Sequence, residues 1–325
     1  MKIWNLPIVE ILPFSDIEDK REVCLIYSAA ALEAVGDLPL KEVSRHEVIE
    51  ATEAHFTEIA EAAEGEVLYA VGGGVAVDAA KYAGMKTGLP VVSLPTAMTV
   101  DAFFTWASGI REDRCVRYVE TGPPERVILD FDVLAAAPDT LRAAGICDVL
   151  SIATGSWDWR FARDRGHLDE ATRYSEWADH TAQSILNAAL DCVEAAGRGE
   201  RDGLKQLIDC LALEVQLCNQ IGHSRPEEGS EHYFAYSAEH HVASSLPHGD
   251  LVGPGILIAA HLQGQDITPL KAALNACRVP LMNIPHEATH TTLLGLAEYA
   301  KQHGLPYGIA HEVDTIPPNL SDILE

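Results

Sequence analysis

The stretch that decides the fold runs from Val71 to Gly84 and reads VGGGVAVDAAKYAG. The apolar run at residues 66–71 precedes the three glycines, and a segment of helical character at 75–88 follows them. A helix N-terminus carries unpaired N–H groups and partial positive charge, and glycine lets a phosphate approach the backbone closely. The string is not GxGxxG, so the usual dinucleotide-binding fingerprint is not met. The glycines alone are therefore compatible with a phosphate-binding loop and equally with a tight turn that binds nothing.

Further short β-rich runs lie at residues 22–27, 89–94 and 126–129, and helical spacing runs through residues 45–64. Strands that alternate with helices predict a parallel sheet with helices on both faces. We find no second βα unit of the usual length between Tyr27 and Arg45. The N-terminal half is therefore predicted to be a shortened version of such a domain.

After about residue 132 the chain becomes rich in Ala, Leu and Glu and shows no convincing strand. The sequence predicts an α/β, Rossmann-like N-terminal domain at 1–131 and an all-helical C-terminal domain at 132–325. The helices are expected at 139–153, 172–196, 203–221, 231–244, 251–262, 267–276 and 291–303.

The charge of the chain excludes several classes of partner. Asp and Glu outnumber Lys and Arg by 49 to 23, which gives a formal net charge of −26. Nucleic acids and anionic membranes need a positive footprint, so neither is an expected partner. An anionic substrate would need a local positive patch or a metal ion to overcome this negative field.

The cysteines and the apolar runs indicate a cytoplasmic protein. The 7 cysteines are odd in number and include no CxxC pair, so a disulfide framework or a cysteine zinc cluster is not expected. No apolar run approaches the ~20 residues that span a bilayer, and no secretory signal pattern opens the chain.

Polar residues follow the glycine turn at defined spacings. Asp78 and Lys81 lie at i and i+3 on the predicted helix, which on its own is equally a surface ion pair. The next predicted strand ends in PTAMTVD, residues 95–101. Because open α/β sheets bind ligands at the carboxyl ends of their strands, Asp101 is a candidate site residue.

Three further places offer metal-binding side chains. Asp148 in AAGICDVLSI would be costly to bury unpaired, although it is equally a helix cap. His232 follows Ser230, a candidate N-cap, and His248 lies in a loop before an apolar helix. These side chains could meet only in a cleft. His223, His240 and His241 are weaker candidates.

The string GGGVAVDAAK resembles the GGGxxxDxAK signature of the iron-dependent alcohol dehydrogenase and dehydroquinate synthase-like superfamily, and PTAMTVD resembles its PTxxxxD string. The resemblance implies that an NAD or NADP cofactor is bound by residues of both strings: Gly72, Gly73, Gly74, Asp78, Lys81, Thr96 and Thr99. It places Asp101 near the substrate. GICD, GSEH and HGDLVG imply one divalent metal, Zn²⁺ or Fe²⁺, on Asp148, His232 and His248, which makes these residues catalytic together with Asp101.

The strings WDWRFA (157–162) and SRPEEGSEH (224–232) look like those of the sn-glycerol-1-phosphate dehydrogenases within this superfamily. This resemblance implies reduction of dihydroxyacetone phosphate, a small phosphorylated substrate. His223 or Arg225 could contact it. Phe103, Phe104 and Trp106 are either core residues or pocket residues.

Two other functions stay open at this point. One is a cyclase or lyase of the same superfamily that uses NAD transiently on a sugar phosphate. The other, motivated by the short N-terminal half, is a non-catalytic relative that binds a metabolite. The apolar helical half also makes a homo-oligomer the expected assembly.

Overall fold

The computed structural model describes residues 2–113, 115–242 and 246–325. The N-terminal half forms a six-stranded sheet in the order β1-β8-β5-β4-β2-β3, in which every pairing is parallel. Its strands are β1 (Ile8–Ile11), β2 (Glu22–Tyr27), β3 (Lys41–Glu47), β4 (Val67–Gly72), β5 (Val91–Pro95) and β8 (Arg126–Leu129). The predicted parallel sheet is confirmed.

The sheet is buried on both faces, as a parallel sheet with continuous apolar strands should be. All six residues of β4 are buried. In β2, Cys24 and Ile26 belong to one core and Val23 and Leu25 to the other, because successive side chains of a strand point to opposite faces. The helices that pack on the sheet are α1 (Ala29–Val35), α2 (Glu53–Ala62) and α3 (Gly74–Thr87).

The predicted helix at 45–64 is wrong in its first half. Residues Lys41–Glu47 form strand β3, which pairs with β2 at the sheet edge, and helix α2 begins only after Thr52, whose side chain accepts a hydrogen bond from the His55 N–H. The apolar positions that suggested one helix therefore belong to the loop after β3, with Val48 and Ile49, and to the short helix α2. A second βα unit is present before the glycine turn, although α1 has only 7 residues.

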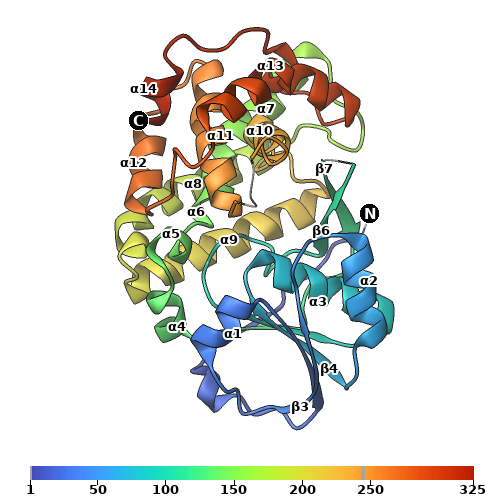
Figure 1. Ribbon diagram of the computed structural model, residues 1–325. Coiled ribbons are helices and arrows are strands. Elements are labelled where there is room, and N and C mark those ends of the chain that lie inside the picture. The colour runs from blue at the N-terminus through green and yellow to red at the C-terminus, as the bar shows by residue number, and fades with distance from the viewer. Residues whose placement is uncertain (1, 114, 243–245) are drawn as a thin grey trace.

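A two-stranded antiparallel hairpin, absent from the predicted elements, interrupts the crossover from β5 to β8. Its strands are β6 (Ala107–Glu112) and β7 (Cys115–Glu120), and they form a sheet of their own. The hairpin stands beside α10 at the upper edge of the sheet half (Figure 1). It thus connects the two halves of the molecule near the candidate site.

Helices joined by loops make up the C-terminal half, and no strand lies among the residues that the structure describes there, which confirms the predicted class. Its helices are α4 (Phe131–Ala136), α5 (Asp139–Arg142), α6 (Ile146–Leu150), α7 (Ile152–Arg165), α8 (Glu176–Gly197), α9 (Arg201–Ile221), α10 (Ser230–Ala238), α11 (His248–Leu262), α12 (Thr268–Ala276), α13 (His286–Gln302) and α14 (Leu320–Leu324). Short 3₁₀ turns lie at Phe14–Asp16 and Ile309–Glu312. The division into domains at residue 131 stays a prediction.

Several predicted helices have different bounds. Helix α13 begins at His286 rather than at residue 291, and α11 begins at His248, which the sequence analysis places in a loop. Two other differences have identifiable reasons. The segment at 139–153 is divided into α5, α6 and the start of α7, because Gly145 packs directly on the backbone near Met98, to whose carbonyl its N–H donates at 2.7 Å. The predicted helix at 231–244 ends at Ala238, and residues 243–244 lie outside the described residues. One core cluster runs from the sheet through the helical half, so the two halves share a continuous interior.

Candidate active site

The glycine turn, Gly72–Gly74, links β4 to α3 and exposes backbone where other residues would place side chains. Gly72 has a φ of +145°, and a Cβ there would lie 2.7 Å from the Ser28 Oγ. Cβ atoms on Gly73 and Gly74 would lie 3.2 Å from Thr99 Oγ1 and 2.9 Å from Val100 Cγ2. Among the described residues no side chain caps α3 at this end. The free N–H groups and the missing Cβ atoms fit a phosphate.

Asp78 and Lys81 form a buried ion pair rather than the surface pair that spacing alone allows. The Lys81 Nζ lies 3.1 Å from Asp78 Oδ1, and the lysine side chain has no exposed area. The ammonium also donates to the Ala102 carbonyl at 2.9 Å and to Thr105 Oγ1 at 3.0 Å, and it contacts the Ala107 carbonyl. In this structure Lys81 therefore fixes the segment after Asp101. Direct contact of Asp78 and Lys81 with a cofactor stays a prediction.

The segment PTAMTVD runs from the glycine turn to the helical half. The Thr96 N–H donates to the Gly72 carbonyl at 3.3 Å, and Thr99 lies against Gly73. At the other end the Asp101 N–H donates to Asp148 Oδ2 at 2.8 Å. Burial and then the charge of Asp148 raise the pKa of Asp101 to about 8, so this carboxyl holds a proton at neutral pH.

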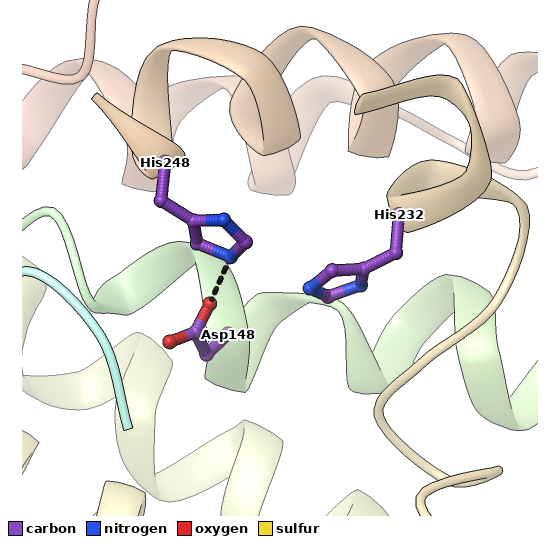
Figure 2. A group of neighbouring side chains, drawn as sticks. All are labelled: Asp148, His232 and His248. Atoms are coloured by element: carbon purple, nitrogen blue, oxygen red, sulfur yellow. Dashed lines mark hydrogen bonds and ion pairs between the residues drawn. The ribbon is translucent and has the colours of Figure 1, made fainter. Parts of the chain in front are cut away.

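Asp148, His232 and His248, which we call the metal trio, come from three helices and point toward one another (Figure 2). One possible ligand atom from each lies within 4.8 Å of the other two. His248 Nε2 lies 3.1 Å from Asp148 Oδ1. Asp148 and His232 are buried, while a quarter of the His248 side chain is exposed. Two imidazoles and a carboxylate are a donor set that Zn²⁺ and Fe²⁺ accept, and three protein ligands leave a position for substrate.

Two buried carboxylates hold the start of α10, which carries His232. Glu231 Oε1 lies 2.9 Å from His232 Nδ1 and accepts the Gly229 N–H at 2.6 Å. This contact leaves the His232 Nε2 free for a metal. Burial alone would lower the pKa of His232, but the hydrogen bond and the charge of Glu231 outweigh it and raise that pKa to about 9.

The N-cap of α10 is Gly229, not Ser230 as the sequence favours. The Ser230 hydroxyl and N–H instead donate to Asp158 Oδ2 at 2.5 and 2.8 Å. Asp158 Oδ1 accepts from the Ile309 N–H at 2.8 Å and from Gln263 at 3.1 Å. Asp158, of α7, therefore ties four segments together directly behind the metal trio. Its position within a helical WDWRFA string gives no sequence signal for this role.

The other histidines and Arg225 lie outside the trio. The His223 ring packs edge-on against Trp159 with centroids 5.1 Å apart, and burial lowers the pKa of His223 to about 4. Arg225 donates to the Tyr233 hydroxyl at 3.2 Å and to the Tyr307 carbonyl at 2.8 Å. His240 and His241 follow the end of α10. A substrate contact by His223 or Arg225 stays a prediction.

The structure adds residues beside the trio that sequence reasoning missed. The Tyr118 hydroxyl of the hairpin lies 2.9 Å from the Tyr236 hydroxyl, which donates to Glu228 Oε1 at 2.7 Å. The hairpin is tied to the end of α10 a second time by the Arg111–Glu239 ion pair at 3.2 Å. Phe103 and Phe104 are fully buried and belong to the core. The β-branched and aromatic residues of β7, which reads CVRYVE, were the available signal for the hairpin.

None of the helices among the described residues is both long and apolar enough to cross a membrane.

Residues 23–138 match the family model described as iron-containing alcohol dehydrogenase. The chain is 32% identical over 253 residues to a glycerol-1-phosphate dehydrogenase (NAD(P)+) of Aeropyrum pernix, which covers 77% of this chain and 70% of that protein. It is 30% identical over 213 residues to the protein of the same name from Pyrococcus abyssi, covering 65% of this chain and 60% of that one. The matched part thus spans about two thirds of these relatives.

Solved structures share the fold over nearly the whole chain. A probable glycerol dehydrogenase from Sinorhizobium meliloti superposes with a TM-score of 0.71 at 17% identity, covering 99% of this chain and 97% of that chain. A sulfoacetaldehyde reductase from Bifidobacterium kashiwanohense, solved in complex with NAD+, gives a TM-score of 0.59 at 14% identity, with 99% and 96% coverage. At these identities the likeness concerns the fold.

Proposed function

The chain belongs to the glycerol-1-phosphate dehydrogenase family within the iron-containing alcohol dehydrogenases, and from this premise we propose that it is a metal-dependent NAD(P)H oxidoreductase. Its proposed reaction transfers a hydride between the nicotinamide and a small polyol phosphate. The substrate we propose is dihydroxyacetone phosphate, which the reaction reduces to sn-glycerol 1-phosphate.

One observation carries this proposal. A single seven-residue segment, 95–101, touches the glycine turn at one end through Thr96 and the metal trio at the other end through Asp101. A cofactor phosphate at the turn and a substrate oxygen at the trio would therefore belong to one site. Open α/β sheets bind ligands at this edge, outside the carboxyl ends of their strands.

The trio would hold one divalent metal, Zn²⁺ or Fe²⁺, which supplies Lewis-acid stabilisation of charge on the substrate oxygen. NADH or NADPH supplies the hydride. The protein groups do the rest: the N–H groups at Gly73 and Gly74 would bind the cofactor phosphates, with Thr96 and Thr99 beside them. Glu231 orients His232 through its Nδ1.

Reduction of a ketone also consumes a proton, and we propose that Asp101 supplies it. Burial and then the charge of Asp148 raise the pKa of its carboxyl group to about 8, which favours the protonated carboxyl before the metal binds. Its backbone is fixed by the hydrogen bond to Asp148, and Lys81 holds the residues that follow. We assign to Asp101 the proton that the product hydroxyl gains.

The test is oxidation of NADH and NADPH, followed by absorbance, with dihydroxyacetone phosphate, unphosphorylated dihydroxyacetone and several sugar phosphates. Each substrate is assayed after metal removal and after addition of Zn²⁺ or Fe²⁺. We expect metal-dependent turnover that favours dihydroxyacetone phosphate. Conversion of a sugar phosphate without net oxidation of the cofactor, or no turnover of any substrate, would contradict the proposal. The homo-oligomer expected from the sequence stays a prediction, to be tested by light scattering on the same preparation.

A further inference from the structure

A second group of acids lies next to the metal trio without belonging to it. Glu214 is on α9, and Glu227 is in the segment that leads into α10. Leu211, one turn before Glu214, packs against Gly145 near the start of α6, which carries Asp148. We call Glu214 and Glu227 the glutamate pair. Neither takes part in the grouping of ligand atoms around His232 and His248.

Three of the four oxygens of the glutamate pair lack a hydrogen-bond donor, and Glu227 has one hydrogen bond with the Cys218 thiol. Glu214 is 1% exposed, and neither of its carboxylate oxygens has a hydrogen-bond donor among the described residues. The same holds for Glu227 Oε2. The next residue shows the contrast, because Glu228 accepts from the Tyr236 hydroxyl at 2.7 Å and the Ser224 hydroxyl at 2.5 Å. Buried carboxylates are ordinarily paired, so three oxygens without donors call for a partner of another kind.

The surrounding charges make these oxygens more costly still. Burial, and after it the charge of Glu227, raise the pKa of Glu214 well above its usual range. Burial also raises the pKa of Glu227 well above its usual range, and the hydrogen bond with Cys218 lowers that pKa only in part. The whole chain adds a net charge of −26 to this local excess. The charges of the two glutamates therefore act on each other within a chain that is strongly acidic as a whole.

The basic side chains around this region are committed elsewhere. Lys81, whose charge acts on Asp101, is bonded to Asp78 and to backbone carbonyls. Arg111 is paired with Glu239 at 3.2 Å. Arg225 donates to a tyrosine hydroxyl and a carbonyl behind α10. Each of these three cations is therefore engaged with a partner other than the glutamate pair.

We propose that Glu214 and Glu227 bind a hard cation, of the Mg²⁺ type, in a site distinct from the metal trio. Carboxylate oxygens are the ligands that such cations prefer, and one divalent ion balances two carboxylates. The trio, with its two imidazoles, suits a softer metal, so the two sites select different ions. The bound cation offsets the field that would otherwise repel a phosphorylated substrate, but its binding does not depend on the proposed reaction.

The first experiment measures thermal unfolding of the Zn²⁺-loaded full chain at constant ionic strength. MgCl₂, CaCl₂, NaCl and KCl are each titrated against tetramethylammonium chloride, whose cation is too large for a carboxylate pair. We expect a saturable rise in Tm with Mg²⁺ or Ca²⁺ beyond that with tetramethylammonium. Glu214→Gln and Glu227→Gln should each remove this rise. Asp209→Asn, which deletes an exposed carboxylate of the same helix paired with Lys205, should retain it.

The second experiment counts the ions directly. Mn²⁺ added to the Zn²⁺-loaded protein is followed by electron paramagnetic resonance, since Zn²⁺ outcompetes Mn²⁺ at the trio. We expect one bound Mn²⁺ per chain, displaced by excess Mg²⁺, in the wild type and in Asp209→Asn but not in Glu227→Gln. This measurement keeps the proposal testable if Glu214→Gln does not fold.

The proposal is overturned if the wild type binds no Mn²⁺ and shows no cation-specific rise in Tm. It is overturned equally if Glu214→Gln and Glu227→Gln retain both effects. If the wild type binds no cation, the negative charge of the glutamate pair is neutralised by protons instead. Cation binding that persists in a protein without NAD(P)H oxidation would defeat the proposed function alone, and turnover without cation binding would defeat only this inference.

Discussion

The glycine turn and the metal trio lie on two sides of one segment, yet they are built in opposite ways. The turn is three consecutive residues whose use depends on missing side chains, since each Cβ would lie 2.7 to 3.2 Å from a neighbouring side-chain atom. The trio joins helices α6, α10 and α11 from positions 148, 232 and 248, and its use depends on side chains held by other side chains.

This difference shows where each site is vulnerable. A backbone site is damaged by adding atoms, and the damage stays local because the turn is held by its own strand and helix. A side-chain site is damaged by removing atoms, including those of residues such as Glu231 and Asp158 that would touch no ligand. Variants in the two regions should therefore separate cofactor binding from metal binding.

The largest effect is expected from His248→Ala, which removes one of the three candidate ligands. Losing the Lewis acid costs several kcal/mol of transition-state stabilisation, so kcat/KM should fall by about 10³-fold or more. Binding of NADPH, measured by fluorescence, should change little. A variant that keeps wild-type turnover would break the distinction between the two regions.

The next effect concerns pH and the residues behind the trio. Burial, reinforced by Glu231, raises the pKa of Asp158 from its ordinary 3.8 to about 6. Between these values the folded state binds the proton and the unfolded state does not, so this group's contribution to stability falls as pH rises from about 4 to 6. At 1.36 kcal/mol per pKa unit the fall is about 3 kcal/mol.

Urea unfolding at pH 4 to 7 tests this, with Asp158→Asn expected to lose that part of the slope. Asp19 in the sheet half is the matched control. Burial would raise its pKa, but hydrogen bonds from Arg21 and Tyr69 outweigh burial and lower it to about 2. Its contribution is therefore complete above about pH 4 and is lost only in stronger acid. Asp19→Asn should shift stability evenly across the range, and equal slopes in the wild type and Asp158→Asn would refute the prediction.

Glu231→Gln should have an intermediate effect confined to the metal side. The amide keeps an oxygen but loses the charge that favours the Nδ1-protonated ring of His232, so metal affinity should fall by about 10- to 100-fold. Competition with a chelating dye measures this. Unchanged affinity would mean that the helix backbone alone positions His232.

The smallest effect is expected at the turn. A methyl group on Gly73 lies 3.2 Å from Thr99 Oγ1, in the space proposed for cofactor phosphates, and its φ of −92° suits alanine. Gly73→Ala should raise the KM for NADPH by about tenfold, which is about 1.4 kcal/mol, and leave metal content unchanged. Gly295→Ala, where an added Cβ meets nothing within 4 Å, is the control. A fall in metal content would show that the two regions are coupled.

The two regions also differ in how far the sequence predicts them. The strand, glycine turn and helix follow from local composition, and β4 and α3 lie where the pattern predicts them. Asp148, His232 and His248 could be grouped only through the family resemblance, because nothing local to each residue reports on the other two. The burial that pairs Lys81 with Asp78, and the role of Asp158, depend on tertiary packing and have no periodic signal.

The features that the sequence analysis missed also depend on tertiary packing. Strand β3 is exposed along most of its length, so its sequence lacks the apolar run that marks the buried strands, and a helix was expected instead. The burial of the glutamate pair could not be predicted from the sequence, because an acid in an amphipathic helix or a loop ordinarily faces solvent. Glu214 is buried on α9, which packs against α8 and α6.

The central claim is that side chains of three helices form one metal site beside a separate backbone site for the cofactor. The most direct measurement is the metal content and NADPH affinity of the wild type, His232→Ala and Gly73→Ala, purified side by side. The account predicts one Zn²⁺ or Fe²⁺ per chain in the wild type and in Gly73→Ala and none in His232→Ala, with weakened NADPH binding in Gly73→Ala alone. Full metal content in His232→Ala, or no metal in the wild type, would contradict it.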